Sequence, residues 1–418
     1  MQLKSQMTQP LSKYFLAAAT KMLAVVDCVG HGSNQHEVTA TGDLFEMLGD
    51  QPRKLVRGSS DERFDAIYVH VTETDDVIAD TGKLSWYDSR ANQPHRGPEW
   101  RLYYQANDIT RAMKPGDQLF IVVLPDRTIG FLACDRDSSF QGLVEAIFRV
   151  QHSKSEQMVI IPVSPDTSSP ADYFTFQLLD ALGIEPDIPP DFDAASVVAQ
   201  FKGTFPPTAT FSTLARETLP GLDPRDDPDK VLLAWIDREE AMFRALERGI
   251  VGDRLMLGFL DSRGEPDVDA FLKFSLSVQN RRKSRAGHAL MNHFSKILRA
   301  FEIPFTPEAT TEKKGAADFL FPSEAAYADP GFPSANLRMV AAKTSCKDRW
   351  RQVLAEADRI KPKHLLTLQP KISLAQTTEM TDQGIILTLP SPIHSSFQDD
   401  QRASLLTVAD LLQELASL

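Results

Sequence analysis

The order of apolar patterns in the second half of the chain restricts the fold more than any other feature. In residues 230–280, apolar side chains recur at three- and four-residue spacing, as they do on one face of a helix. Helical segments then alternate with short apolar runs that suit buried strands, and such an alternation indicates a mixed α/β domain. The expected helices cover 286–301, 347–360, a short segment near 373 and a segment from 404, and the expected strands are ADFLFP, NLRMVAAKT, HLLTLQ and GIILTLP.

The first half of the chain has a different pattern and predicts mostly strands. FDAIYVHVTET alternates as a strand does, and DQLFIVVLPDRTIGFLAC predicts a hairpin that turns at Pro125, Asp126 and Arg127. QGLVEAIFRVQ has helical spacing, and QMVIIPV predicts a short buried strand. This half is therefore expected to be β-rich.

The length and the distribution of proline divide the chain. With 418 residues it is too long for one typical core and fits two domains. Between residues 186 and 228 prolines are frequent and acids outnumber bases, which is typical of turns and linkers. We expect an N-terminal β-rich domain over 1–165, an acidic proline-rich linker over 166–205, and an α/β domain over 206–418.

Composition excludes several classes of protein. Apolar residues at 42% and charged residues at 24% are ordinary for a globular chain. The net charge of −12 argues against nonspecific coating of nucleic acid, although it leaves a local basic groove open. The three cysteines form no CxxC pair, which argues against a disulfide framework or a zinc site and favours a reducing cytoplasm. Residues 15–26 form an apolar segment that is too short for a membrane span, and we expect a buried helix there rather than a signal peptide.

Two polar residues at strand ends suggest hydrolytic chemistry. Asp318 stands just before one apolar run, and Lys343 ends the next. If the two strands are neighbours, the carboxylate can hold Mg²⁺, and the lysine can position a water molecule and offset charge on a phosphate. Ala341 occupies the place where a D/E-x-K nuclease carries its second acid, but Glu356 in the following helix can replace it. By spacing alone, an ordinary strand and helix is the favoured explanation of these residues.

A basic strip lies within an otherwise acidic protein. Residues 281–300, which include Arg282 and Arg285, contain six lysines or arginines and no acid. Such a strip can line a phosphate backbone, and the alternative is a solvated helix end. Further on, Arg349 suits guanine and Asp348 suits cytosine, or both simply form salt bridges along a helix.

The N-terminal half offers weaker candidates for contacts with DNA. The segment WYDSRANQPHRGPEWR is rich in arginine, aromatic residues and turn formers, and it contains the candidates Trp86, Arg90, Arg96 and Arg101. The alternative is a surface hairpin in which the aromatic side chains are buried. Two histidines near GHGSNQH lack further ligands nearby, so an ordinary polar loop is expected there.

Several long segments resemble one known family. VQNRRKSRAGHAL, DFLFPSEAAY, NLRMVAAKTSCKDRWRQVLAEADRI, HLLTLQ and SLAQTTEM are similar, in this order, to the EcoRII-type restriction endonucleases. The resemblance extends back through FPPTATFSTLARETLPGLDP and covers roughly residues 205–418. The N-terminal half resembles the same family more faintly, at HVTET and WYDSR.

The resemblance implies a fold and a catalytic set. The fold would be a PD-(D/E)xK nuclease core, with its second acid moved to the following helix, preceded by a B3-like pseudobarrel that binds DNA. By match of motif, Asp318, Lys343 and Glu356 are catalytic, and the two acids hold Mg²⁺. Arg282 and Tyr327 also fall on positions of functional importance in the family.

The same resemblance implies a substrate and partners. Lys347, Asp348 and Arg349 match the positions that read CC:GG base pairs. The family cuts double-stranded DNA as a homodimer at sites of the CC-x-GG type, and a companion DNA methyltransferase acting on the same site is expected. In its best-known member the N-terminal domain covers the nuclease until it binds DNA.

One difference from the family's sequence pattern supports a second hypothesis about function. The family's helix carries a glutamate where this chain has Met291. A type II restriction endonuclease is the main hypothesis, and a DNA-binding sensor with the nuclease fold but little or no catalysis is the alternative. A third class, an α/β enzyme that does not act on nucleic acid, would have no need of the basic strip.

Overall fold

The computed structural model divides into two compact units, Met1–Glu185 and Pro186–Leu418, and each is considered by itself. It describes residues 10–31, 36–41, 43–44, 47, 63–72, 76–90, 93, 95–150, 155–164, 169–186, 193–312, 316–346 and 349–418. The expected linker 166–205 contains one helix of each unit, so its limits stay a prediction.

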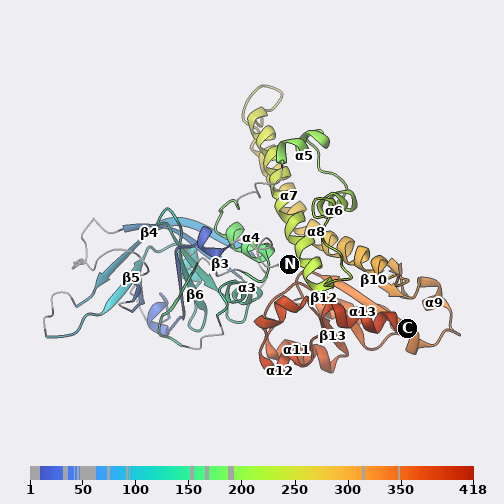
Figure 1. Ribbon diagram of the computed structural model, residues 1–418. Helices are drawn as coiled ribbons and strands as arrows, with labels where there is room; N and C mark the ends of the chain where they lie inside the picture. Colours follow the sequence, from blue (N-terminus) through green and yellow to red (C-terminus); the bar gives the residue numbers. More distant parts are fainter. Residues whose placement is uncertain are drawn as a thin grey trace. The chain divides into compact units, whose positions relative to one another are not determined.

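The first unit is built on one sheet of eight strands among the described residues, in the order β2-β5-β4-β3-β7-β6-β1-β8 (Figure 1). Every neighbouring pair is antiparallel except β3 with β7. The elements are β1 (Ala17–Met22), β2 (Glu37–Thr39), β3 (Arg63–Val71), β4 (Val77–Asp88), β5 (Trp100–Tyr104), α2 (Asp108–Ala112), β6 (Gln118–Val123), β7 (Ile129–Cys134), α3 (Ser139–Ile147), β8 (Val159–Ile161) and α4 (Asp172–Ala181).

The expected hairpin forms the centre of this sheet and is confirmed. All residues of β6 and β7 are buried, which explains their continuous apolar sequence. Arg127 adopts φ 71° in the connecting turn. Gly130 is required for packing, because a Cβ there would lie 2.6 Å from Val122 Cγ2 and 2.9 Å from Leu182 Cδ2.

The expectation of a helix over 15–26 is wrong, because this segment contains strand β1. β1 lies between β6 and β8 and pairs with both. Its single lysine, Lys21, is buried; the ammonium lies 2.7 Å from Asp27 and donates to the carbonyl of Thr39. An alanine-rich run favours a helix locally, but pairing on both sides overrides that preference.

The second unit is mixed α/β, as expected, and the α/β class is confirmed. Its sheet has the order β13-β12-β11-β10-β9; β9, β10 and β11 are antiparallel, whereas β11, β12 and β13 are parallel. The strands are β9 (Thr306–Thr310), β10 (Ala316–Phe321), β11 (Arg338–Lys343), β12 (Lys363–Thr367) and β13 (Ile385–Thr388), and the helices are α5 (Ala194–Gln200), α6 (Thr208–Glu217), α7 (Pro228–Leu257), α8 (Val268–Ala300), α9 (Glu324–Ala328), α10 (Trp350–Leu354), α11 (Leu374–Asp382), α12 (Asp399–Arg402) and α13 (Val408–Ala416).

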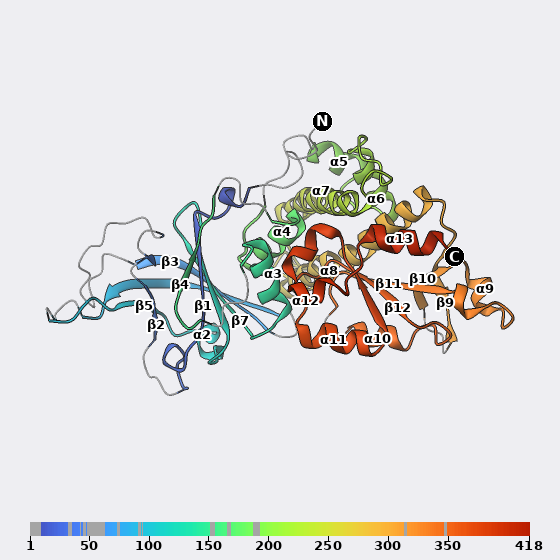
Figure 2. The same ribbon diagram turned by 60° about the horizontal axis from the view of Figure 1, so that its bottom comes forward.

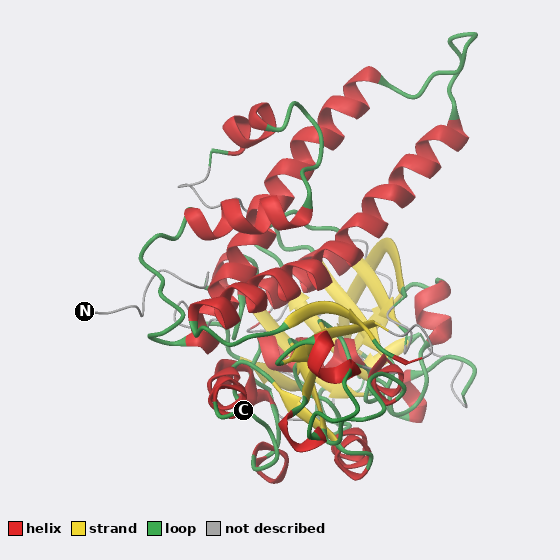
Figure 3. Cartoon of the chain, turned by 90° about the vertical axis from the view of Figure 1, so that its right-hand side faces the viewer, coloured by secondary structure: helices red, strands yellow, loops and turns green. Residues whose placement is uncertain are grey.

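Helices cover both faces of this sheet. α8 packs on β11 from one side, whereas α10 and α11 lie along the other side (Figure 2). α7 and α8 pair as a long helical hairpin (Figure 3). The two helices expected over 268–280 and 286–301 are one continuous helix, α8. The phenyl ring of Phe294 meets that of Phe319 at 5.3 Å and anchors α8 on β10.

Two local expectations differ from the structure in this unit. Strand β9 was not expected, because TPEAT lacks an apolar alternation. The helix expected over 347–360 is confined to α10, which ends at Leu354. Glu356 therefore lies beyond the helix and does not share a helix face with Arg349, the residue before α10.

None of the described helices is long and apolar enough to cross a membrane.

Candidate active site

Asp318 and Lys343 meet on adjacent antiparallel strands. Phe319 of β10 pairs with Val340 of β11, and this register places Asp318 beside the end of β11. The Oδ2 atom of Asp318 accepts hydrogen bonds from the backbone N–H of Ala342 and from Lys343 Nζ, both at 2.8 Å. The two side chains are 16% and 22% exposed, so the pair is open to a ligand on one side.

Glu356 is electrostatically coupled to this pair. Burial raises the pKa of Glu356 from its ordinary 4.5 to about 7; Lys343 lowers it, and Asp318 raises it further. Its Oε2 atom is buried and has no hydrogen-bond partner among the described residues. A buried, unsatisfied carboxylate oxygen near a second carboxylate is a place where a cation is favourable.

A sharp turn places the Glu356 side chain. The N–H of Glu356 donates to the carbonyl of Val353 at 3.2 Å, and that of Ile360 donates to Ala357 at 3.0 Å. Ala357 adopts φ 49°, a left-handed conformation that residues other than glycine seldom take. Such backbone persists only where surrounding contacts hold it, and here those contacts come from a neighbouring brace.

Tyr327 belongs to that brace. Its hydroxyl donates to the carboxylate of Glu312, which also accepts the N–H of Asp358 at 3.3 Å. The guanidinium of Arg359 donates to the carbonyls of Tyr327, Asp329 and Phe332 and lies 5.5 Å from the Tyr327 ring centroid. The brace therefore ties the turn after Glu356 to α9 and to the end of β9.

Arg282 and Arg285 of the basic strip point to carboxylates of α7. Arg285 is 5% exposed and pairs with Glu239 at 3.3 Å and with Glu240. Arg282 pairs with Glu247 at 2.5 Å. The anions that balance these two cations thus lie within the same unit, and the expected role of the two arginines in DNA recognition stays a prediction.

The same buried network includes groups that the sequence did not single out. His293 Nε2 lies 2.9 Å from Glu239, and its Nδ1 lies 3.1 Å from an Arg216 nitrogen. Burial lowers the pKa of His293, although Glu239 acts in the opposite direction. The signal available in the sequence was the acidic run of α7, IDREEAMFRALE, at a spacing that can face a basic helix.

The base-reading candidates are only partly described. Arg349 is exposed at the N-terminus of α10 and forms no ion pair with any described residue. Lys347 and Asp348 lie outside the described residues. Met291, the departure from the family pattern, is half-buried in α8.

In the first unit, Trp86 is corrected as a candidate for DNA contact. It is 2% exposed and stacks on Trp100 at 5.3 Å between ring centroids, so the alternative of a buried aromatic side chain holds. Arg90 and Arg101 both pair with Glu99, at 3.0 and 2.7 Å. Arg96 is exposed.

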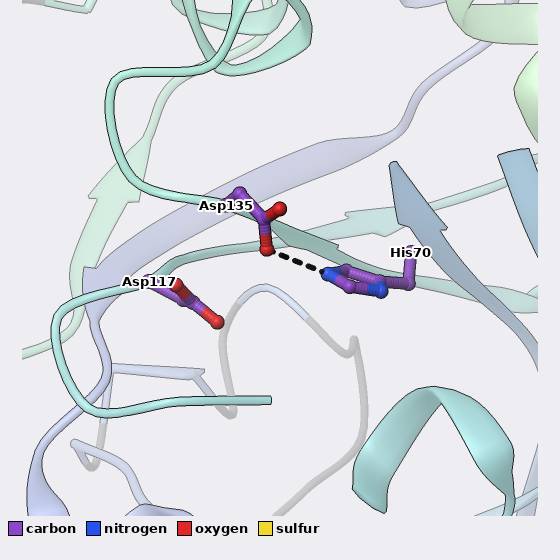
Figure 4. A group of neighbouring side chains, drawn as sticks. All are labelled: His70, Asp117 and Asp135. Carbon is purple, nitrogen blue, oxygen red and sulfur yellow. Dashed lines mark hydrogen bonds and ion pairs between the residues drawn. The ribbon is translucent and has the colours of Figure 1, made fainter. Parts of the chain in front are cut away.

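A cluster of polar side chains in the first unit was missed. His70 near the end of β3, Asp117 before β6 and Asp135 after β7 have ligand atoms within 4.8 Å of one another (Figure 4). His70 Nε2 lies 3.0 Å from Asp135 Oδ1. Burial and the charge of Asp135 raise the pKa of Asp117, against the hydrogen bond from Lys114. One imidazole and two carboxylates form a donor set that a divalent cation accepts. The three strand ends meet only after the sheet forms.

Known proteins resemble the second unit most clearly. Residues 243–412 match the family model described as EcoRII C terminal. Over 193 residues, 46% of this chain, the sequence is 44% identical to the type II restriction enzyme EcoRII of Escherichia coli, and the match covers 46% of that protein. The chain thus spans about half the length of the curated relative that it matches.

Two solved structures are more distant. A complex of the restriction endonuclease PspGI with substrate DNA aligns over 51% of this chain and 93% of its own, with 17% identity and a TM-score of 0.42. The B3 domain of the UbaLAI restriction endonuclease with cognate DNA aligns over 36% and 91%, with 16% identity and a TM-score of 0.20. The family match and the identity to EcoRII thus show that residues 243–412 of this chain are similar to the EcoRII C-terminal family.

Proposed function

We propose that this protein is a type II restriction endonuclease that makes Mg²⁺-dependent double-strand cuts in DNA. The observation that supports the proposal is the contact of Lys343 with Asp318, both of which act on the pKa of Glu356, in a segment that matches the EcoRII C-terminal family. Asp318, Lys343 and Glu356 come from three different segments of the second unit.

The donor chemistry fits a hard divalent cation. Asp318 and Glu356 offer carboxylate oxygens, and the buried Oε2 of Glu356 has no hydrogen-bond partner among the described residues. Carboxylates and water are the ligands that Mg²⁺ accepts. When bound, Mg²⁺ would polarise the scissile phosphate and lower the pKa of a water molecule.

The chain's own residues supply the remaining steps. The backbone N–H of Ala342 holds one Asp318 oxygen and fixes the direction of that carboxylate. Lys343 Nζ donates to the same oxygen, so the ammonium stands at the edge of the anionic pair. There it orients the attacking water and offsets the charge that develops on the phosphate during an in-line displacement. The product would carry a 5′-phosphate.

Substrate and partners form the finer part of the proposal. Arg349 is exposed and suits guanine, and with Lys347 and Asp348 it would read a short CC-x-GG-type site. A near-palindromic site calls for a two-fold protein, so a homodimer is proposed. A companion methyltransferase would protect the same site in the cytoplasm, and the first unit would regulate cleavage by binding DNA.

Met291 favours one alternative function. If the glutamate that the family has at this position supports metal binding, its loss favours a DNA-binding sensor that keeps the fold but cleaves slowly or not at all. The intact set of Asp318, Lys343 and Glu356 favours the nuclease.

The test is a cleavage assay on plasmids with and without CC-x-GG sites, in Mg²⁺ and in EDTA. A nuclease cuts only the plasmid with sites and only with Mg²⁺, and sequencing of the ends gives the position of the cut. Specific binding without nicking or cutting would favour the sensor instead.

A further inference from the structure

Lys363 is a buried lysine that has no role in the chemistry above. It is the first residue of β12 and is 2% exposed. Lysine is seldom buried so fully unless its ammonium is satisfied by partners. The partners of Lys363 therefore indicate what it does.

The ammonium of Lys363 binds the end of α10. Its Nζ donates to the carbonyls of Val353 at 3.2 Å and Leu354 at 2.7 Å. The last carbonyls of a helix lack partners within the helix and carry partial negative charge, so a cation there is favourable. α10 has only five residues, and a helix this short does not fix its own end.

The backbone held by Lys363 leads directly into Glu356. The carbonyl of Val353 that accepts from Lys363 also accepts the N–H of Glu356 at 3.2 Å. The next residue, Ala357, has the left-handed φ of 49°. The direction of the Glu356 side chain thus depends on a turn whose first support is Lys363.

The charges around Lys363 agree with this geometry. The groups that act on it are Asp358, Glu356, Lys361 and Glu312, three of which are acidic. Burial lowers the pKa of Lys363, and the acids act in the opposite direction. Lys363 in turn lowers the pKa of Glu356.

We propose that Lys363 is a positioning residue: by binding the last carbonyls of α10, it directs the Glu356 carboxylate toward Asp318 and so raises the affinity of the site for a divalent cation. The proposal rests on the proposed function, because it takes this pair of carboxylates as the metal site. Lys363 would then be a residue of the site that lies outside the D/E-x-K pattern.

The test compares Lys363→Met with Lys361→Met. Lys361 is exposed and only two residues away, so its replacement removes the same charge from the same segment without touching the α10 carbonyls. Two quantities are measured: Mn²⁺ binding by calorimetry, and the Mg²⁺ dependence of single-turnover cleavage. A Glu356→Gln protein identifies the binding that belongs to this site rather than to His70, Asp117 and Asp135 of the first unit.

Loss of a residue that orients a metal ligand costs about 10- to 100-fold in metal affinity. For Lys363→Met we expect a loss of this size in Mn²⁺ affinity and a matching rise in half-saturating Mg²⁺. The maximal rate and the metal-free affinity for DNA should stay close to those of Lys361→Met. Lys363→Gln, whose amide can donate to one carbonyl, should lie in between.

A purely structural role gives a different result. If Lys363→Met lowers the melting temperature or the active fraction but leaves metal affinity equal to that of Lys361→Met, the positioning role is overturned. If neither Lys363 variant folds, Lys363 serves stability alone, and the proposal is overturned as well.

The proposed function can fail separately. A wild-type protein that cuts no DNA but shows Glu356-dependent Mn²⁺ binding refutes the nuclease, and the binding data alone still decide the role of Lys363. A wild-type protein without Glu356-dependent binding refutes the positioning proposal.

Discussion

Two groups of charged residues in the second unit differ in how completely their charges are paired within the protein. In the α7–α8 pair, the buried guanidinium of Arg285 lies against Glu239 and Glu240, and the imidazole of His293 lies against Glu239. Around Asp318 and Lys343, in contrast, the buried carboxylate of Glu356 forms no ion pair with a described residue. A balanced network stabilises or specifies the fold, whereas an unbalanced one is available for a ligand.

The largest effect, on the cleavage rate, is expected at the group of Asp318, Lys343 and Glu356. Lys343→Ala should lower the cleavage rate by about 100-fold or more, because the charge that offsets the phosphate is lost. Specific binding, measured by gel shift in EDTA, should change little. A parallel loss of binding would argue that Lys343 holds DNA rather than serving the reaction.

In the α7–α8 network, a substitution should mainly lower the free energy of unfolding. Arg285→Met leaves Glu239 and Glu240 buried without this cation, and breaking a buried pair costs about 3 to 5 kcal/mol. Urea unfolding of the purified protein measures this loss. If stability is unchanged but DNA affinity falls, Arg285 contacts DNA and the contrast between the two groups is lost.

The raised pKa of Glu356 predicts a pH dependence. In metal-free protein the folded state keeps a proton between pH 4.5 and about 7 that the unfolded state has lost. Stability therefore falls as pH rises through this window, by on the order of 3 kcal/mol, and levels off above it. Glu356→Gln should lack this fall, so the stability difference between variant and wild type should grow from pH 5 to pH 8; a constant difference would contradict the shift.

The first unit should restrain the second. Removing residues 1–185 keeps α5 on α7 and should raise the cleavage rate at single sites several-fold, if the first unit regulates the nuclease. Rates on a plasmid with one site measure this. An unchanged or lower rate would leave the first unit without a restraining role.

The smallest effect is expected at the edge of the balanced network. Arg282 is 34% exposed in its pair with the buried Glu247, so solvent screens the pair from the arginine's side, and Arg282→Ala should cost about 1 to 2 kcal/mol, less than Arg285→Met. Arg285→Met is the matched reference in the same unfolding experiment, because both arginines lie on α8 and bind acids of α7. Equal losses would show that burial does not separate them.

Local sequence was sufficient for much of the fold and part of the site. The hairpin of β6 and β7 and the strands β10, β11, β12 and β13 were predictable because each contains a short apolar run bounded by turn residues. The positions of Asp318 and Lys343 at strand ends were visible for the same reason. Strand β1 was not predictable, because its pairing partner β6 lies far along the chain. The early end of α10, where Lys363 binds the last carbonyls, has no signal in the local sequence.

By itself, the sequence determined the alternation of helices and strands and the presence of the Asp318, Lys343 and Glu356 motif. Only the tertiary structure decided which polar groups pair: the arginines of α8 with acids of α7, the hydroxyl of Tyr327 with Glu312, and the carbonyls at the end of α10 with Lys363. The physical reason is the separation along the chain over which each kind of interaction acts. Backbone propensity and apolar periodicity act over a few residues, whereas burial and ion pairing join residues far apart in the chain and appear only when the elements pack.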